Sequence, residues 1–120
     1  MRIGFFEIKA HIPKIFKEKQ GNVYILFDKY FKRYKIGYTY GTVVDRCKQI
    51  ASASGSEYEI VYYFKGWRKN EKYLHRQLEK YKLKGEFYAH DEYVKNMFHC
   101  FAHGVLTGAD ASKNYGVQYV

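Results

Sequence analysis

The sequence contains little cysteine, proline or tryptophan. In 120 residues there are two cysteines (Cys47 and Cys100), one proline and one tryptophan. A secreted scaffold of this size usually carries more cysteines, so we expect both thiols to be reduced and buried in a cytoplasmic, intracellular protein. The N-terminal stretch MRIGFFEIKAHIPK is broken by charges, unlike a signal peptide, and no apolar run approaches the length of a membrane span. We therefore expect a soluble protein with no membrane contact.

Acidic residues are also scarce. There are 12 Asp and Glu against 21 Lys and Arg, which gives a formal net charge of +9. A surplus of this size produces a positive field that favours a polyanionic partner. Aromatic residues make up 20% of the chain, and tyrosine, with 14 copies, can pack its ring while its hydroxyl reaches a phosphate. The composition favours nucleic acid over an anionic membrane surface, and a basic protein kept soluble by its charge is the simpler alternative.

The length suits a single domain with one hydrophobic core. Residues 23–27 and 34–38 are apolar, strand-like runs separated by a short polar segment, which predicts an antiparallel hairpin. Residues 58–64 predict a third strand. Gly37, inside the second strand, indicates a bulge or a close backbone approach. We divide the chain into an N-terminal lead-in (1–20), a domain (21–103) and a C-terminal tail (104–120).

Three helices are expected within the domain. Thr42, Asn70 and Asp91 are good N-cap residues, and each precedes apolar residues at helical spacing. The lead-in could add a strand over 3–8 and a helical turn over 14–19, and the tail could add a strand over 115–120. The predicted fold class is α+β, a small single domain with a mainly antiparallel three-stranded sheet flanked by helices.

Two tyrosines on the predicted hairpin are candidates for chemistry. If the rings of Tyr24 and Tyr34 share a face of the sheet, their phenol oxygens converge on one patch. A cross-strand aromatic pair, common in sheets, explains the same pattern without function.

Arg46 is predicted at the edge of the core-facing stripe of the first helix, beside Val43 and Ile50. A guanidinium there needs an anionic partner because it cannot lose its charge. The partner could be a phosphate or a carboxylate, and a structural salt bridge is equally compatible with the pattern.

Glu71 and His75 are spaced to be neighbours on the second helix, and both lean towards its apolar stripe. A carboxylate in that position is costly unless it binds a cation or hydrogen-bond donors. Mg²⁺ is often held by one carboxylate together with water and substrate phosphate. The alternative is a first-turn glutamate stabilised by the helix dipole.

Basic residues crowd the segment around Glu71 and could grip a nucleic-acid backbone, or form a solvated helix face. The candidates for nucleic-acid binding are Lys65, Arg68, Lys69, Lys72 and Arg76. The segment His99-Cys100-x-x-His103 has zinc-like spacing, but the phenylalanines around it favour core packing.

The order of these features resembles the GIY-YIG nuclease superfamily, and in particular a branch known from phages and large DNA viruses. The similarity covers about residues 22 to 96. The matching motifs are Asn22-Val23-Tyr24 within V-Y-I-L, Tyr34-Lys35-Ile36-Gly37, Arg46, Glu71 in E-K-Y-L-H with His75, and Lys84-Gly85-Glu86-Phe87-Tyr88.

The resemblance implies hydrolysis of DNA phosphodiester bonds with one divalent ion, Mg²⁺ or Mn²⁺, to 5′-phosphate and 3′-hydroxyl ends. It implies that Tyr24 acts as general base or orients the attacking water, with help from Tyr34 or Lys35. Arg46 would stabilise the charge that develops on the phosphorus centre, and Glu71 would hold the metal.

The chain departs from the family pattern at two positions. Asn22 replaces the leading glycine of the first tripeptide, and Ile50 stands where some members have a histidine, so Lys35, Tyr38 or His75 would take over an acid–base role. Asn96 is a loose match to a late asparagine. Two alternatives to a nuclease follow: a non-catalytic nucleic-acid-binding module, and an inhibitor that binds another protein. Duplex DNA is the expected partner, and the oligomeric state stays open, with a homodimer among the possibilities.

Overall fold

The computed structural model describes residues 19–107. The helices and strands follow in the order β2 (Gly21–Asp28), β3 (Arg33–Thr39), α2 (Val43–Ser54), β4 (Tyr58–Gly66), α3 (Arg68–Gln77), a 3-10 turn (Glu79–Tyr81), β5 (Lys82–Lys84), β6 (Phe87–Ala89) and α4 (Glu92–Thr107). The strands suggested for 3–8 and 115–120 lie outside the described residues, as does the helical turn over 14–19 except for Lys19.

The strands form one antiparallel sheet in the order β4-β2-β3-β6-β5. The expected α+β class and the β2–β3 hairpin are confirmed, with Tyr24 opposite Gly37 and Phe27 opposite Tyr34. The expected count of three strands is wrong, because β5 and β6 add two more. Each has only three residues, which is too short for an alternating pattern to stand out in the sequence.

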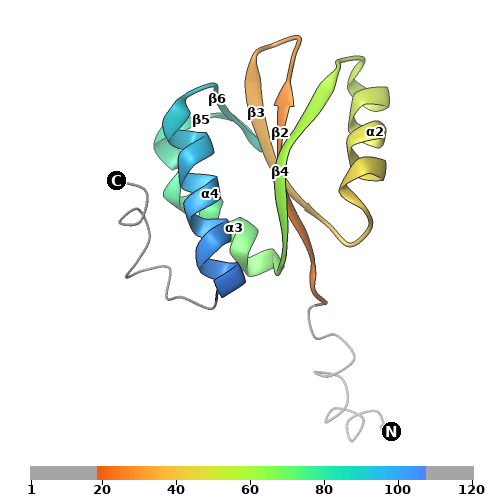
Figure 1. Cartoon of the computed structure of the whole chain (residues 1–120). Coiled ribbons are helices and arrows are strands. Elements are labelled where there is room, and N and C mark those ends of the chain that lie inside the picture. The colour runs from red at the N-terminus through yellow and green to blue at the C-terminus, as the bar shows by residue number, and fades with distance from the viewer. Residues whose placement is uncertain (1–18, 108–120) are drawn as a thin grey trace, which may run out of the picture.

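Helices cover both faces of the sheet: α2 lies on one side, and α3 and α4 lie on the other (Figure 1). The larger core is on the α3–α4 side and contains Val23, Ile25, Leu74 and Phe98, all fully buried. The smaller core is on the α2 side, where Tyr24, Leu26 and Val43 are buried against the partly buried Cys47 and Ile50. Alternate residues of β2 thus enter different cores, as the two-residue period of a strand requires.

The helix starts agree with the expected caps in two of three cases. The Thr42 hydroxyl accepts a hydrogen bond from the Asp45 amide at 3.1 Å, and an Asp91 carboxylate oxygen accepts one from the Tyr93 amide at 2.8 Å. The prediction for Asn70 is wrong in its detail. Helix α3 begins at Arg68, and the Asn70 side chain accepts a hydrogen bond from the Trp67 amide at 2.7 Å. Asn70 therefore lies within the first turn of α3 and caps it by accepting a hydrogen bond from the preceding Trp67.

Cys100 is buried, Cys47 is half-buried, and neither forms a disulfide with another described residue. Between residues 19 and 107, none of the helices has the length and apolar character needed to cross a bilayer.

Candidate functional site

The Tyr24 side chain lies across Gly37 on the neighbouring strand. A Cβ atom at position 37 would come within 2.5 Å of Tyr24 Cζ and would also collide with the hydroxyl. The close approach expected at Gly37 is confirmed, because only a residue without a side chain leaves room for the phenol. Strand β6 pairs with β3 over Arg33–Lys35, and one more backbone hydrogen bond runs from the Ile36 amide to the Glu86 carbonyl at 3.1 Å, before Gly37 is reached. The Tyr24 hydroxyl therefore reaches the part of β3 that β6 leaves uncovered.

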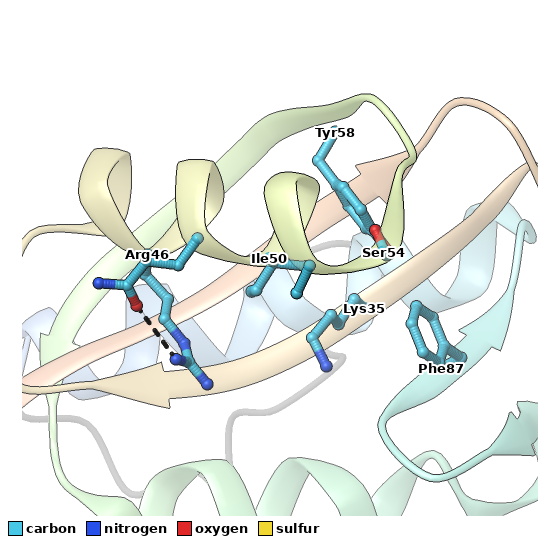
Figure 2. Close-up of a pocket in the computed structure, with 8 residues that line it drawn as sticks. Lys35, Arg46, Ile50, Ser54, Tyr58 and Phe87 are labelled. Atoms are coloured by element: carbon cyan, nitrogen blue, oxygen red, sulfur yellow. Dashed lines mark hydrogen bonds between the residues drawn. The ribbon is translucent and has the colours of Figure 1, made fainter.

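Arg46 lies on α2 beside this phenol and lines a surface hollow. We call it the Arg46 hollow; Lys35, Gln49, Ile50, Tyr58 and Phe87 also line it. Figure 2 shows the Arg46 and Lys35 side chains there. Arg46 Nη1 donates a hydrogen bond to Gln49 Oε1 at 3.3 Å. Arg46 Nε is buried and has no hydrogen-bond partner among residues 19–107. A buried, unpaired guanidinium N–H is costly, so the hollow suits an anion.

A second hollow adjoins the first. We call it the Glu71 hollow, and it is lined by Arg68, Glu71, Lys72, His75, Lys82 and Glu86, together with Gly85. An ion pair between Lys35 Nζ and Glu86 Oε1, at 3.0 Å, connects the two hollows, since each residue lines a different one. Cationic groups thus flank a small acidic centre on both sides.

That acidic centre consists of Glu71, His75 and Glu86. Their ligand atoms all lie within 4.8 Å of one another, and they are the one such group among the described residues. The Glu71 side chain is 8% exposed and its Oε2 lies 3.1 Å from His75 Nε2. Because two carboxylate oxygens and an imidazole nitrogen meet at one point, the group offers a cation three protein ligands.

Tyr88 contacts this centre through His75. Its hydroxyl is hydrogen-bonded to His75 Nδ1, and its ring is fully buried. Burial, with smaller contributions from nearby glutamates, raises the pKa of Tyr88 well above its usual range, so the phenol keeps its proton. This hydrogen bond at Nδ1 fixes the imidazole ring so that Nε2 faces the carboxylates.

The environment of Tyr24 decides its protonation. Burial raises the pKa of Tyr24 above 10.0, while the hydrogen bond and positive charge of Arg46 lower it, and the carboxylates of Glu86 and Glu71 raise it again. The net direction is upward, so Tyr24 is a neutral phenol at neutral pH. Arg46 on α2 thus interacts with the Tyr24 phenol on β2, and Glu71 on α3 and Glu86 in the β5–β6 turn are near enough to affect its pKa.

The expected convergence of Tyr34 with Tyr24 is wrong. Tyr34 pairs with Phe27 in the sheet, one step out of phase with Tyr24, so its ring enters the larger core. There it packs edge-on against Phe27 and against His90, with ring centroids 5.8 and 5.2 Å apart. The next residue, Lys35, lies on the opposite face of the sheet from Tyr34, and its side chain lines the Arg46 hollow.

The predicted nucleic-acid-binding residues divide into two groups. Arg68 and Lys72 line the Glu71 hollow. Arg76 lies over the Tyr73 ring at 5.8 Å, and Tyr73 stacks on Phe101 of α4, so this side of α3 faces away from the hollow. Lys69, one helical turn before Tyr73, and Lys65, on β4, are exposed and line neither hollow.

Glu86, Lys82 and Tyr88 are contributions that the sequence did not single out as site residues. Glu86 follows Gly85, whose φ of +55° makes the turn between β5 and β6. The sequence held one signal that could have indicated Glu86: an acidic residue directly after a glycine, within the motif Lys84-Gly85-Glu86-Phe87-Tyr88. Nothing in the spacing of Tyr88 indicated its bond to His75.

The two departures from the family pattern have structural roles. The Asn22 side chain donates to the Gly41 carbonyl at 3.0 Å and ties down the segment that leads into α2. Ile50 packs against the smaller core and lines the Arg46 hollow. Asn96 is exposed on α4 and lines neither hollow. Cys100 is buried, and His99-Cys100-x-x-His103 forms no metal-ligand group within residues 19–107.

A family model, the T5orf172 domain, matches residues 21–103. The chain belongs to the T5orf172 domain family. This family is phage-associated, and some of its members have a GIY-YIG-like, nuclease-like fold. No curated protein and no solved structure matches the chain significantly. The family accounts for the region that contains both hollows and the acidic centre.

Proposed function

We propose that this T5orf172 domain is a metal-dependent DNA endonuclease that hydrolyses phosphodiester bonds to 5′-phosphate and 3′-hydroxyl ends. The main support is one juxtaposition: the Tyr24–Arg46 pair lies beside a three-ligand acidic centre, with Lys35 between them. A nuclease-like role in some members of the family is consistent with this assignment.

The acidic centre fits a divalent cation. The Glu71 carboxylate is nearly buried and clusters with Glu86, and the nearest cations, Arg68 at 3.9 Å from Glu71 and Lys35 at 3.0 Å from Glu86, pair with one carboxylate each. A divalent cation would bind both carboxylates at once. Glu71, Glu86 and His75 Nε2 would hold the ion, and the mixture of oxygen and nitrogen donors suits Mn²⁺ at least as well as Mg²⁺. When bound, such an ion would stabilise negative charge on the phosphate and its leaving oxygen.

Arg46 and Lys35 bind and orient the phosphate. The unpaired Arg46 Nε–H supplies a preformed donor, and the Arg46 hollow is wide enough to admit a backbone phosphate from solvent. Negative charge increases on the phosphate oxygens in the transition state, so donors fixed in advance stabilise it more than the ground state.

Tyr24 orients the attacking water. Its raised pKa makes it a poor base at neutral pH, but a neutral phenol can accept a hydrogen bond from Arg46 and still donate one. The hydroxyl is fixed by its position over Gly37. This favours the orienting role over proton abstraction, the two roles that the resemblance left open.

The test is cleavage of supercoiled plasmid DNA with Mn²⁺ or Mg²⁺. We expect nicking or cutting by the wild type and loss of activity in Glu71→Gln and Arg46→Ala, each with an unchanged circular dichroism spectrum. Glu92→Gln, which alters an exposed glutamate on α4, is the matched control and should retain activity. Undiminished cutting by Glu71→Gln would refute the proposed centre. Salt-sensitive binding without cleavage in any metal would instead identify a binding module.

A further inference from the structure

The turn between β2 and β3 exposes two aromatic rings. Tyr30 is 74% exposed and Phe31 is 59% exposed, and their rings pack edge to face with centroids 4.9 Å apart. Exposed rings on a surface turn are an unfavourable use of apolar area unless a partner covers them. Lys29 and Lys32 flank the pair, so the turn is also cationic.

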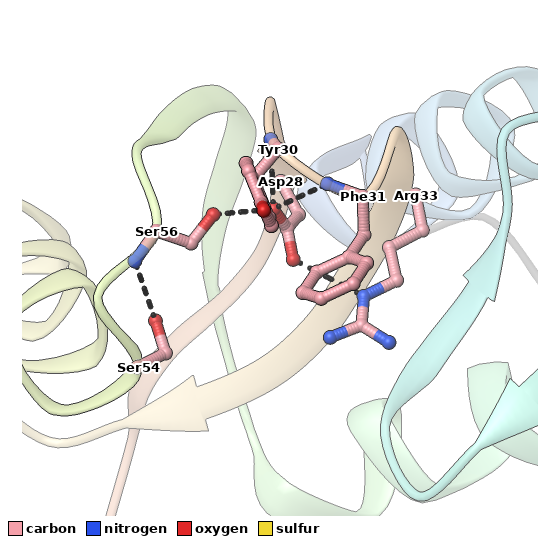
Figure 3. A network of polar contacts seen from close by, with 6 residues as sticks. All are labelled: Asp28, Tyr30, Phe31, Arg33, Ser54 and Ser56. Carbon is pink, nitrogen blue, oxygen red and sulfur yellow. Dashed lines mark hydrogen bonds and ion pairs between the residues drawn. The ribbon is translucent and has the colours of Figure 1, made fainter.

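This turn is held rigidly from beneath by Asp28, whose side chain is fully buried. One Asp28 oxygen accepts hydrogen bonds from the Ser56 hydroxyl at 2.6 Å and from the amides of Tyr30 and Phe31 at 3.1 Å (Figure 3). The other accepts one from Arg33 Nε at 3.1 Å. These bonds fix the backbone of the turn, and the rings contact each other and Arg33, so less conformational entropy is lost when a partner binds.

Arg33 links the turn to the candidate site. Its guanidinium carbon lies 4.6 Å from the centroid of the Phe31 ring and 3.6 Å from that of Phe87. Phe87 lines the Arg46 hollow. The Phe31 ring, the Arg33 guanidinium and the Phe87 ring therefore form a continuous stack from the exposed turn to the Arg46 hollow.

From this stack we infer that the β2–β3 turn is a stacking platform for an unpaired base on the DNA strand whose phosphate Arg46 holds. The inference rests on the proposed function and narrows its substrate to DNA with an unpaired or extruded nucleotide. Aromatic faces and guanidinium planes accept any base by stacking, and the flanking lysines attract the backbone, so the platform selects unpaired structure and not sequence. Inside an intact duplex the bases are already stacked on each other and cannot use it.

The test is equilibrium binding of the full chain without divalent metal, so that affinity is measured whether or not the chain cleaves DNA. The probes are a blunt duplex and the same duplex with a short unpaired tail that contains 2-aminopurine. We expect the wild type to bind the tailed duplex more tightly and to change the fluorescence of 2-aminopurine. Phe31→Ala should weaken binding of the tailed duplex by about 5- to 100-fold and leave the blunt duplex nearly unaffected.

Two further variants separate stacking from other effects. Phe31→Trp should retain the preference, whereas Phe31→Leu, which keeps an apolar side chain without a ring, should lose it. Tyr93→Ala is the matched control, since Tyr93 is 45% exposed on α4, on the other face of the sheet. The proposal would be overturned if Phe31→Ala weakened binding of the tailed and the blunt duplex equally. It would also be overturned if Phe31→Leu kept the full preference for the tailed duplex. Cleavage by wild type with no preference for the tailed duplex would overturn it while sparing the proposed nuclease function.

Discussion

The ring of Tyr24 occupies the space that a side chain at position 37 would fill. We predict that Gly37→Ala displaces the phenol, since the added Cβ would lie 2.5 Å from Tyr24 Cζ. The free energy of unfolding should fall by about 1–3 kcal/mol, as for other overpacked positions. Chemical denaturation measures this loss, and plasmid cleavage should fall at least as far as in Tyr24→Phe.

Gly41→Ala is the control for that experiment. A Cβ at position 41 would have its nearest neighbour, Thr39 Oγ1, 3.9 Å away, which is an ordinary contact. Its effect on the unfolding free energy should stay within about 0.5 kcal/mol. If Gly37→Ala were as well tolerated as Gly41→Ala in both assays, the placement of Tyr24 would be incorrect.

The protonation of Tyr24 gives a pH-dependent prediction. Because burial raises the pKa of Tyr24 above 10.0, its phenol stays neutral below a pH of about 9. A residue that orients water is active in this form, so Tyr24→Phe should lower kcat by about 100-fold and leave the shape of the pH profile unchanged. A wild-type rate that rises tenfold per pH unit towards pH 10, and a Tyr24→Phe rate that does not, would show that Tyr24 is the base.

The acidic centre predicts stabilisation by metal. A cation that binds only the folded chain raises the unfolding free energy by about 2.7 kcal/mol at 100 times its dissociation constant. Mn²⁺ should therefore raise Tm by several degrees, and by at least as much as equimolar Mg²⁺ because of the His75 ligand. The shift should disappear in Glu71→Gln and shrink in Glu86→Gln. Persistence of the full shift in both variants would place the ion elsewhere, and Glu92→Gln should behave as wild type.

Asp28 should make stability depend on pH in the acid range. Burial alone would raise the pKa of Asp28, but hydrogen bonds from Ser56, Phe31, Arg33 and Tyr30 outweigh it and hold the pKa below 3.8. A lowered folded-state pKa stabilises the fold above the unfolded-state pKa, and this stabilisation is lost as the pH falls through the folded-state value.

Asp28→Asn should thus lower the unfolding free energy at pH 7 by about 2 kcal/mol. The difference from wild type should narrow once the pH falls below about 4. Urea denaturation at several pH values measures both effects. A difference that stays constant down to the lowest pH would mean that the carboxylate charge contributes nothing.

Local signals in the sequence predicted most of the fold. The apolar run Val23–Phe27, the second run Tyr34–Tyr38 and the Thr42 cap each depend on neighbouring residues, and each element formed where it was expected. The expected sheet did not include β5 and β6 because three residues are too few to show a period, and their pairing with each other and with β3 is a tertiary effect.

Predictions for the site were less complete because they depend on register. Tyr24 and Tyr34 are both on the hairpin, but which face each ring occupies follows from the pairing of Phe27 with Tyr34, and a shift by one residue reverses the answer. Glu86 joins Glu71 and His75 only because the β5–β6 turn folds back towards α3. Sequence separation alone could not indicate that contact.

The outermost strand on one side of the sheet, β5, has the sequence Lys-Leu-Lys and is exposed along its whole length. A second copy that paired there through its own β5 would bring its lysines against Lys82 and Lys84, and three residues offer few backbone groups for pairing. Self-association through this edge is therefore unfavourable. At the opposite edge lies β4, which has nine residues and pairs only with β2 within the described part of the chain. Of the two edges, β4 is the more favourable for pairing between copies, and pairing there would leave the lysine-rich edge beside the Glu71 hollow clear for polyanions.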